Sequence, residues 1–296
     1  MRARIQDRIA TIVLSLIALL IIGTLVGLLG FILTQGWHKL NLDFLTSPPD
    51  MIRAGGGIGP QLFNSLYLLV LTMLIAMPLG LGAGIYMAEY APDNKFTQFI
   101  RMSIEVLSSL PSIVVGLFGL LVFVNMTGWG YTLIAGALAL TVFNLPLLVR
   151  VTEDAIRNVP RSQKEASLAL GITKWRTIVS VILPAALPAI LTGAILASGR
   201  VFGEAAALLF TAGMSSPELN FSNFNLSAPD SPLNPFRPAE TLAVHIWKVN
   251  SEGLAPDARE VADGAAAVLI IAVLLFNLSA RWFGSWVYKK MTSGSN

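Results

Sequence analysis

The sequence predicts an all-α membrane protein with six transmembrane helices and one short cytoplasmic helix, in a single membrane domain over residues 1–296. Hydrophobic residues make up 54% of the chain and charged residues only 12%, about half of the charged share of a soluble domain. Apolar runs of about 20 residues, long enough to cross a bilayer as a helix, recur along the chain. Alternating barrel strands are absent from the pattern, so helices must satisfy the backbone inside the membrane.

The first span, residues 9–33, follows a basic N-terminal stretch. Its apolar run is longer than the core of a signal peptide and no small-residue cleavage site follows it, so we expect it to be retained. Pro-Pro and a Gly triplet precede the second span, a short charged turn separates the second from the third, and a hairpin, "NMTGWG", separates the third from the fourth. The remaining spans are predicted at residues 62–88, 106–124, 131–149, 182–210 and 264–280.

The distribution of basic residues predicts the orientation of these spans. Of the 20 Lys and Arg residues, Arg200 falls within a span and only five fall in the segments on one side. The remaining fourteen lie on the side of both termini, which the positive-inside rule places in the cytoplasm. We therefore expect a multi-pass protein of the cell membrane with both termini cytoplasmic. The five residues of the outer side are Lys39, Arg53, Arg237, Lys248 and Arg259, three of them in an outer loop at 214–263.

A cytoplasmic loop at residues 150–181 contains the short helix. Ser162 and Glu165 fit an S-x-x-E capping box, which predicts a helix over Gln163–Leu170. Gly171 stands where a glycine commonly ends a helix. Two interpretations of this helix remain open from its chemistry alone: it rests on lipid headgroups, or it fits a groove on a partner protein.

The segment "EASLALGITKWRTIVSVILP" resembles the EAA loop of ABC-importer permeases. Its Glu and Ala, the following Gly, and the closing Leu-Pro match that pattern, whereas Ser167 replaces the usual second Ala and Val181 the usual Ile. The resemblance implies that this loop is a coupling helix, which docks on a separate ATP-hydrolysing subunit. The docking residues that it implies are Glu165, Ala166, Ser167, Leu170 and Gly171.

The resemblance extends from about residue 55 to residue 283 and is greatest to phosphate-specific permeases of the PstA type. The stretch "SGRVFGEAAALLFTAG" carries it most clearly. It implies a heterodimer with a second homologous permease subunit, a dimer of ATP-binding subunits, an extracytoplasmic phosphate-binding protein, and phosphate as the substrate. Two alternatives remain open: a permease for sulfate, molybdate or phosphonate, and a membrane sensor or scaffold that uses the same docking loop.

The chain lacks the sequence motifs of ATP hydrolysis, zinc-dependent proteolysis and serine hydrolysis. There is no G-x-x-x-x-G-K-[S/T] loop, so ATP and Mg²⁺ are expected on the partner subunit and no cofactor on this chain. There is no H-E-x-x-H or G-x-S-x-G motif, and His38 and His245 fall in outer segments, where ordinary loop histidines are expected. We therefore predict no catalytic residue and no metal site. The basic residues serve membrane orientation, so the lipid bilayer is an expected partner and nucleic acid is not.

Arg200 and Glu204 are the candidate residues of a substrate pathway or gate. On an unbroken helix, residues four apart share a face and can pair. If the fifth span begins near Pro188, this pair lies near mid-membrane, where a charge costs about 2.5–3.5 kcal/mol. Its presence is explained either by an ion pair that locks helices together or by an anion site whose arginine matches phosphate oxygens. The family resemblance favours the second explanation, with Glu204 neutralising Arg200 when the path is empty.

Two prolines also mark expected irregularities. Pro111 predicts a kink in the third span, and Pro146, next to Asn144, predicts a kink in the fourth.

Overall fold

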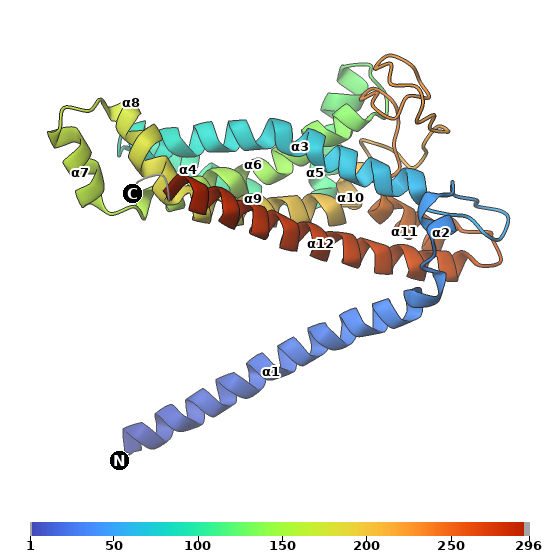
Figure 1. The fold of residues 1–296 in the computed structure, drawn as a ribbon, viewed down its shortest axis with the longest axis horizontal. Helices are drawn as coiled ribbons and strands as arrows, with labels where there is room; N and C mark the ends of the chain where they lie inside the picture. Colours follow the sequence, from blue (N-terminus) through green and yellow to red (C-terminus); the bar gives the residue numbers. More distant parts are fainter. Residues whose placement is uncertain (1, 293–296) are drawn as a thin grey trace.

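Long apolar helices run side by side along the long axis of the molecule (Figure 1). The computed structural model of the chain describes residues 2–292. Within them, five helices are long and apolar enough to cross a membrane, or six if one bent pair forms a single span. Four of these helices correspond to the predicted spans one, two, four and six: α1 (Arg2–Gly36), α3 (Gly59–Ile85) with the π-helical turn η2 (Tyr86–Tyr90), α6 (Leu133–Arg157) and α12 (Ala258–Thr292). Helix α6 begins two residues after the predicted start of span four and extends eight residues past its predicted end.

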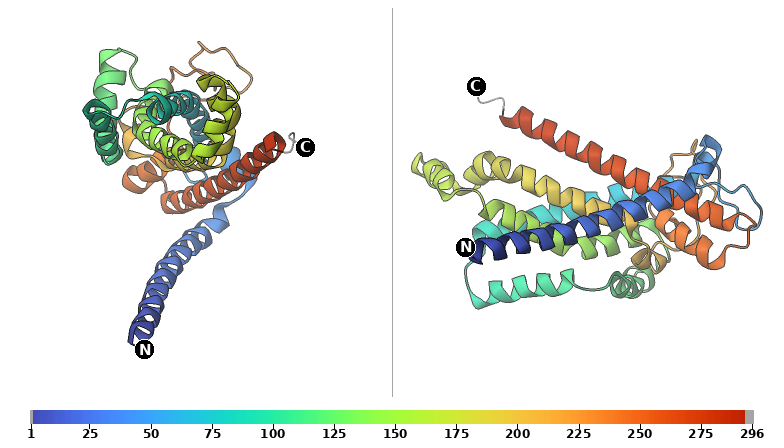
Figure 2. Two further views of the ribbon diagram at one scale, coloured as in Figure 1. Left: turned by 90° about the vertical axis from the view of Figure 1, so that its left-hand side faces the viewer. Right: turned by 90° about the horizontal axis from the view of Figure 1, so that it is seen from below.

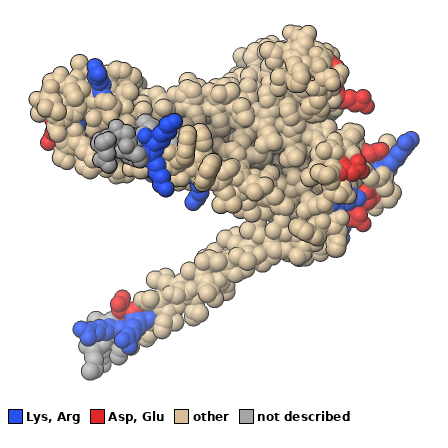
Figure 3. All heavy atoms as spheres, viewed as in Figure 1, with Lys and Arg blue, Asp and Glu red and all other residues tan. Residues whose placement is uncertain are grey.

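On the face shown in Figure 3, charged side chains gather at the two ends of the molecule, with a broad uncharged band between them. The start of α1, the end of α12 and the loop that carries α7 (Arg161–Ala169) lie at one end (Figure 1). At the other end lie α2 (Leu42–Thr46) and α11 (Leu242–Glu252). An apolar band between charged ends is the arrangement that a bilayer-spanning bundle requires.

The core of the bundle is formed where α6 packs between α3 and α9 (Leu183–Gly203). Small residues permit the close approach: a Cβ on Gly84 of α3 would meet the Thr152 side chain of α6 at 2.4 Å, and one on Gly193 of α9 would meet Val151 at 2.3 Å. Because the hydrophobic effect does not drive helices together inside a membrane, their association depends on close packing at small residues such as these glycines.

The predicted third span is broken. The chain forms α4 (Lys95–Ser108), then α5 (Ser112–Gly119) with the π-helical continuation η3 (Leu120–Met126), and the two parts meet at an angle of 100°. Pro111 precedes α5 with an extended ψ of 138°. Because proline lacks an N–H and disfavours helical geometry in the residue before it, the first helix ends here. Residues 106–124 therefore do not form the single straight helix that the hydropathy pattern predicts.

The predicted fifth span begins earlier and ends earlier than expected. Helical structure is continuous from Lys174 to Gly203, through α8 (Lys174–Thr177), the π-helical turn η4 (Ile178–Ile182) and α9. The helix therefore starts before the predicted residue 182. The register in which it begins near Pro188 is not observed, because Pro184 lies in the first turn of α9 and Pro188 inside it. A wider π-helical turn beside such prolines is a known way to re-satisfy the freed backbone groups in a membrane helix.

The region predicted as an outer loop at 214–263 is more ordered than its polar composition suggests. It contains α11, and α12 already begins at Ala258. Several of its polar side chains, among them Arg237, Glu240 and His245, are buried against α3 and α11. The outer end of the molecule is therefore a packed cap on the bundle.

Helix α1 stands away from the bundle for most of its length (Figure 2). It approaches α12 near its C-terminal end, where a Cβ added to Gly36 would meet the backbone oxygen of Asp263 at 2.4 Å and the Ala267 side chain at 2.5 Å. The position of α1 therefore depends on one close crossing with α12.

Replacing Gly36 by valine is expected to open this crossing, because backbone atoms of α12 cannot move aside as a flexible side chain would. Overpacking of this kind costs about 1–3 kcal/mol. Thermal unfolding of the detergent-purified chain should show a lowered midpoint for Gly36→Val. Gly27→Val is the matched control, because that glycine of α1 has no neighbour within 4 Å. Equal midpoints for the two variants would contradict the prediction.

Candidate functional site

Arg200 lies near the end of α9, with its guanidinium carbon 4.2 Å from the centre of the Phe143 ring of α6. Among the described residues it makes no ion pair with Glu204. Helix α9 ends at Gly203, and Glu204 follows with an extended backbone (φ −79°, ψ 116°). Its carboxylate accepts a hydrogen bond from the backbone N–H of Ala207, at 3.3 Å. The expected Arg200–Glu204 pair is therefore not formed, because it required an unbroken helix.

The depth expected for Arg200 also changes. The continuous helix begins at Lys174, so Arg200 lies about 39 Å along it at 1.5 Å per residue. This distance exceeds the thickness of the hydrocarbon core, which is about 30 Å. The arginine thus lies toward the outer end of the helix, and its mid-membrane placement, which depended on a start near Pro188, loses its basis.

The broken third span packs on the segment that follows the break after α9. Helix α10 (Ala206–Leu209) follows the break at Glu204 and packs on α5, where a Cβ on Gly116 would meet the Cα of Ala207 at 2.8 Å. On α6, Asn144 is fully buried and its Nδ2 donates to the Leu140 carbonyl at 2.9 Å, while its Oδ1 has no partner among the described residues. Helix breaks and unpaired polar atoms at membrane depth are typical of positions that line a cavity or path.

The predicted coupling helix is present as α7, but it begins at Arg161. Pro160 precedes it, and no side chain caps its N-terminus, so the predicted capping box of Ser162 and Glu165 is wrong. Ser162 lies inside the first turn, where its hydroxyl is not placed to act as the N-cap. Gly171 ends the helix as predicted: its φ is +76°, and its N–H donates to the Leu168 carbonyl at 3.0 Å.

The exposed face of the coupling loop is apolar. Leu168, Leu170 and Trp175 are exposed, Leu170 by 81% of its surface. Glu165, Ala166 and Gly171 are also accessible, but Ser167 is buried, with its hydroxyl 2.9 Å from that of Thr177. Of the five predicted docking residues, Ser167 therefore points inward, where it links α7 to Thr177 of α8.

Glu89 fastens this loop to the bundle. It lies in the π-helical turn η2 at the end of α3, and its buried carboxylate accepts a hydrogen bond from Lys164 of α7. Lys174, beyond the helix, donates to the Glu89 carbonyl and lies over the Tyr90 ring, 4.4 Å from its centre. Two lysines of the coupling loop, one within α7 and one after it, thus converge on the π-helical turn η2.

Glu89→Gln is expected to loosen the coupling loop, because Lys164 loses a largely buried ionic partner. Trypsin should cleave the folded protein between residues 161 and 176 about five- to tenfold faster, which corresponds to about 1–1.4 kcal/mol. Asp93→Asn is the control, since Asp93 is exposed and stands 3.9 Å from Arg101. Cleavage at the same rate in both variants would show that the pair does not hold the loop.

A buried polar cluster at the outer end is not among the residues that the sequence predicts for a site. Arg237 is 2% exposed and donates to the carbonyls of Ser231, Pro232 and Pro238 and to Asn64 Oδ1 of α3. Burial lowers the pKa of its guanidinium to about 10, which still leaves it charged at neutral pH. The only signal in the sequence is a charged residue inside the Pro-rich stretch "SPLNPFRPAE".

Glu240 forms the second half of this cluster. It accepts from Gln61 Nε2 at 3.0 Å, and its Oε1 lies 3.2 Å from His245 Nδ1 and 3.5 Å from Lys248 Nζ. Burial opposes its ionisation, but these partners, His245 foremost, outweigh burial and hold the pKa of the Glu240 carboxyl below its usual value. His245, expected as an ordinary loop residue, is instead a buried residue of α11.

The family model described as "Binding-protein-dependent transport system inner membrane component" matches residues 80–293 of this chain. The chain belongs to this family. It is therefore a permease subunit of an ABC importer and not the ATP-hydrolysing component, and the predicted all-α fold of membrane-spanning helices is confirmed.

Two named relatives show how far the similarity reaches. The chain is 62% identical over 293 residues to "Probable ABC transporter permease protein YqgI" of Bacillus subtilis (strain 168), covering 99% of this chain and 100% of that one. It is 36% identical over 252 residues to "Phosphate transport system permease protein PstA" of Xylella fastidiosa (strain 9a5c), covering 84% and 82%.

Solved ABC permeases share the fold at low sequence identity. A chain of the MetNI methionine ABC transporter in an inward-facing conformation matches with a TM-score of 0.57 and 18% identity, over 77% of this chain and 93% of that one. A chain of a bacterial alginate ABC importer matches with a TM-score of 0.54 and 15% identity, over 77% and 79%. At such identities only the permease fold follows, and the substrate does not.

Proposed function

We propose that this permease carries inorganic phosphate into the cell. The observation that supports phosphate is the similarity to relatives named as phosphate transport permeases, at 36% identity over 252 residues for one of them. The relative at 62% identity carries a name without a substrate, so it favours the permease function alone. The guanidinium of Arg200, which has no carboxylate partner among the described residues, agrees with an oxyanion as the transported ion.

In this proposal Arg200 is the residue that meets phosphate in the path. Arginine presents fixed, parallel donors that match two phosphate oxygens, and it stays charged throughout transport. The ring of Phe143 packs against its guanidinium in a cation–π contact. Glu204 contributes by holding the first turn of α10 next to the arginine, and not by neutralising it in the state described here.

The proposal assigns partners to the two ends of the molecule. The exposed apolar side chains around Leu170 dock on a dimer of ATP-binding subunits, which binds ATP and Mg²⁺, with Glu165, Ala166 and Gly171 in the same contact. The cap of buried polar residues at the opposite end receives a phosphate-binding protein. A second homologous permease subunit completes the path in a heterodimer, and both termini face the cytoplasm.

Transport by the reconstituted complex tests the substrate. Proteoliposomes that contain this chain, its companion permease and the ATP-binding subunits are loaded with ATP and given the binding protein with labelled phosphate, then sulfate, molybdate or phosphonate. ATP-dependent uptake of phosphate alone would support the proposal. Uptake of another of these anions would keep the permease and replace its substrate, whereas ATP hydrolysis without any uptake would favour a sensor or scaffold.

A further inference from the structure

One face of α6 presents Phe143, Arg150 and Arg157 in a row, from the residue that contacts Arg200 toward the coupling loop. Phe143, Arg150 and Arg157 are seven residues apart, and such residues share one side of a helix with only about 20° of drift per step. Each step advances about 10.5 Å at 1.5 Å per residue. Arg200 lies over the first of these positions, so the two arginines of α6 continue the same line toward α7.

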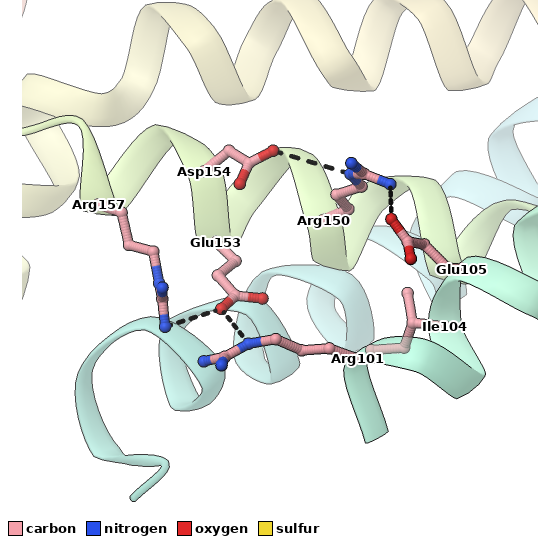
Figure 4. A pocket seen from close by; sticks show the side chains of 7 residues that line it. All are labelled: Arg101, Ile104, Glu105, Arg150, Glu153, Asp154 and Arg157. Atoms are coloured by element: carbon pink, nitrogen blue, oxygen red, sulfur yellow. Dashed lines mark hydrogen bonds and ion pairs between the residues drawn. The ribbon is translucent and has the colours of Figure 1, made fainter. Parts of the chain in front are cut away.

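Neighbouring helices flank this line on both sides. Helix α9 crosses α6 at Val151, against Gly193. Helix α4 lies on the other side, where Arg101 Nε donates to Glu153 Oε1 at 2.9 Å. Between α4 and α6 lies an open pocket of about 320 Å³, a volume within the roughly 300–1,000 Å³ range of small-molecule sites. We call this cavity the inner pocket. Figure 4 shows the charged side chains that line it: Arg101, Glu105, Arg150, Glu153, Asp154 and Arg157.

The three arginines of the inner pocket are held differently. Glu153 is largely buried and accepts from Arg101 at 2.9 Å and from Arg157 at 3.1 Å, so it neutralises that side of the pocket. Arg150 is paired with Glu105 at 2.9 Å, but their side chains are 56% and 63% exposed. Its second carboxylate, Asp154, is 3.9 Å away. Exposed ion pairs contribute little to stability, so an anion can displace Glu105 from Arg150 at little cost.

We propose that the inner pocket is a second oxyanion station, at which Arg150 binds phosphate after it leaves Arg200 and before it reaches the cytoplasm. Glu105 is the counter-ion that Arg150 exchanges for the substrate. The near-balanced charge of the pocket makes this binding weak, which a site of passage requires if the ion is to leave. This assignment rests on the proposed transport of phosphate.

The competing explanation is that the Arg150–Glu105 pair only ties α4 to α6. Two single substitutions separate the explanations, because each removes the same pair. Arg150→Gln removes the anion-binding group, whereas Glu105→Gln leaves that group without its competitor. If the pair only holds α4 against α6, both variants should lose that contact equally. If Arg150 binds the anion, Arg150→Gln should weaken phosphate binding and Glu105→Gln should strengthen it.

The first measurement is phosphate binding by the purified complex without its binding protein, followed by line broadening of inorganic phosphate in ³¹P NMR spectra. We expect saturable broadening in the millimolar range, reduced in Arg150→Gln to the part that Arg200 contributes and shifted to about threefold lower concentration in Glu105→Gln. Arg150→Lys should retain part of it. Lys95→Gln, on the first turn of α4 outside the pocket, is the control and should match the wild type.

The second measurement is uptake by proteoliposomes. Arg150→Gln should lower the maximal rate about tenfold, the loss expected for about one charge-assisted hydrogen bond to the ion, without changing the KM for the loaded binding protein. Unchanged uptake in Arg150→Gln, or equal losses in Arg150→Gln and Glu105→Gln, would overturn the station. If the wild type carries another oxyanion, phosphate fails as substrate and the same variants are judged with that ion. If it carries none, the station fails together with the proposed transport.

Discussion

Replacing Arg200 by alanine is expected to reduce phosphate uptake by about 100-fold or more while assembly of the complex is preserved. Charge-assisted hydrogen bonds are worth about 1.5–3 kcal/mol each, and two of them to one phosphate ion account for a loss of this size, since every 1.4 kcal/mol is tenfold. The residue is half-buried and makes its one described contact with the Phe143 ring. Its removal therefore leaves no buried carboxylate uncompensated, and the effect should fall on transport.

The conservative variants refine this prediction. Arg200→Lys keeps the charge but loses the paired donors, and we expect uptake about tenfold below that of the wild type. Phe143→Leu keeps most of the volume and removes the cation–π contact, which is worth about 0.5–2 kcal/mol. Arg53→Ala, in the exposed segment before α3, serves as the control. Normal uptake by Arg200→Lys would falsify the idea that two-point recognition of the oxyanion occurs here.

Arg237→Met is expected to lower the stability of the protein by about 3 kcal/mol. The methionine fills much of the space but cannot donate, so the Asn64 amide oxygen and the carbonyls of Pro232 and Pro238 lose their partner inside the protein. The Ser231 carbonyl loses one of its two donors and keeps the N–H of Asn234. An unsatisfied buried acceptor costs about 1–3 kcal/mol, and relaxation of the cap limits the sum. For a chain of this size the midpoint of thermal unfolding should fall by roughly 8 °C.

Arg259→Met provides the matched comparison, because Arg259 is exposed at the start of α12. Its midpoint should stay within about 1 °C of the wild type, as expected for surface substitutions within about 0.5 kcal/mol. If Arg237→Met unfolds at the same temperature as this control, the four hydrogen bonds do not hold the cap together. Loss of uptake by Arg237→Met without a change in midpoint would instead assign the arginine to transport.

The long apolar helices and the end of the coupling helix at Gly171 could be predicted because they follow from local rules. Hydropathy over 20 residues marks a span, and a left-handed residue after a helix favours glycine. The breaks could not be predicted in the same way. Pro111 ends α4, whereas Pro146 and Pro188 lie inside α6 and α9. Whether a helix continues through proline depends on neighbouring groups that satisfy its backbone, and these come from distant parts of the chain.

The candidate site shows the same limit. The spacing of Arg200 and Glu204 predicts a shared face only while the helix continues, and it ends at Gly203. Arg237 and Glu240 were counted as loop residues because a polar composition predicts exposure. Their burial depends on Gln61 and Asn64 of α3, more than 170 positions away in the chain. No local pattern in the sequence carries that information.

Helix α3 with its π-helical turn touches both ends of the transporter. At one end Gln61 and Asn64 bind the polar cap, and at the other end Glu89 binds the lysines of the coupling loop. The segment from Gly59 to Tyr90 spans 32 residues, or about 48 Å at 1.5 Å per residue. A rigid rod of that length that tilts by about 5° moves one end by about 4 Å relative to the other. Because one helix contacts both ends, a tilt of α3 would shift the coupling loop and the polar cap relative to each other without any chain having to unfold.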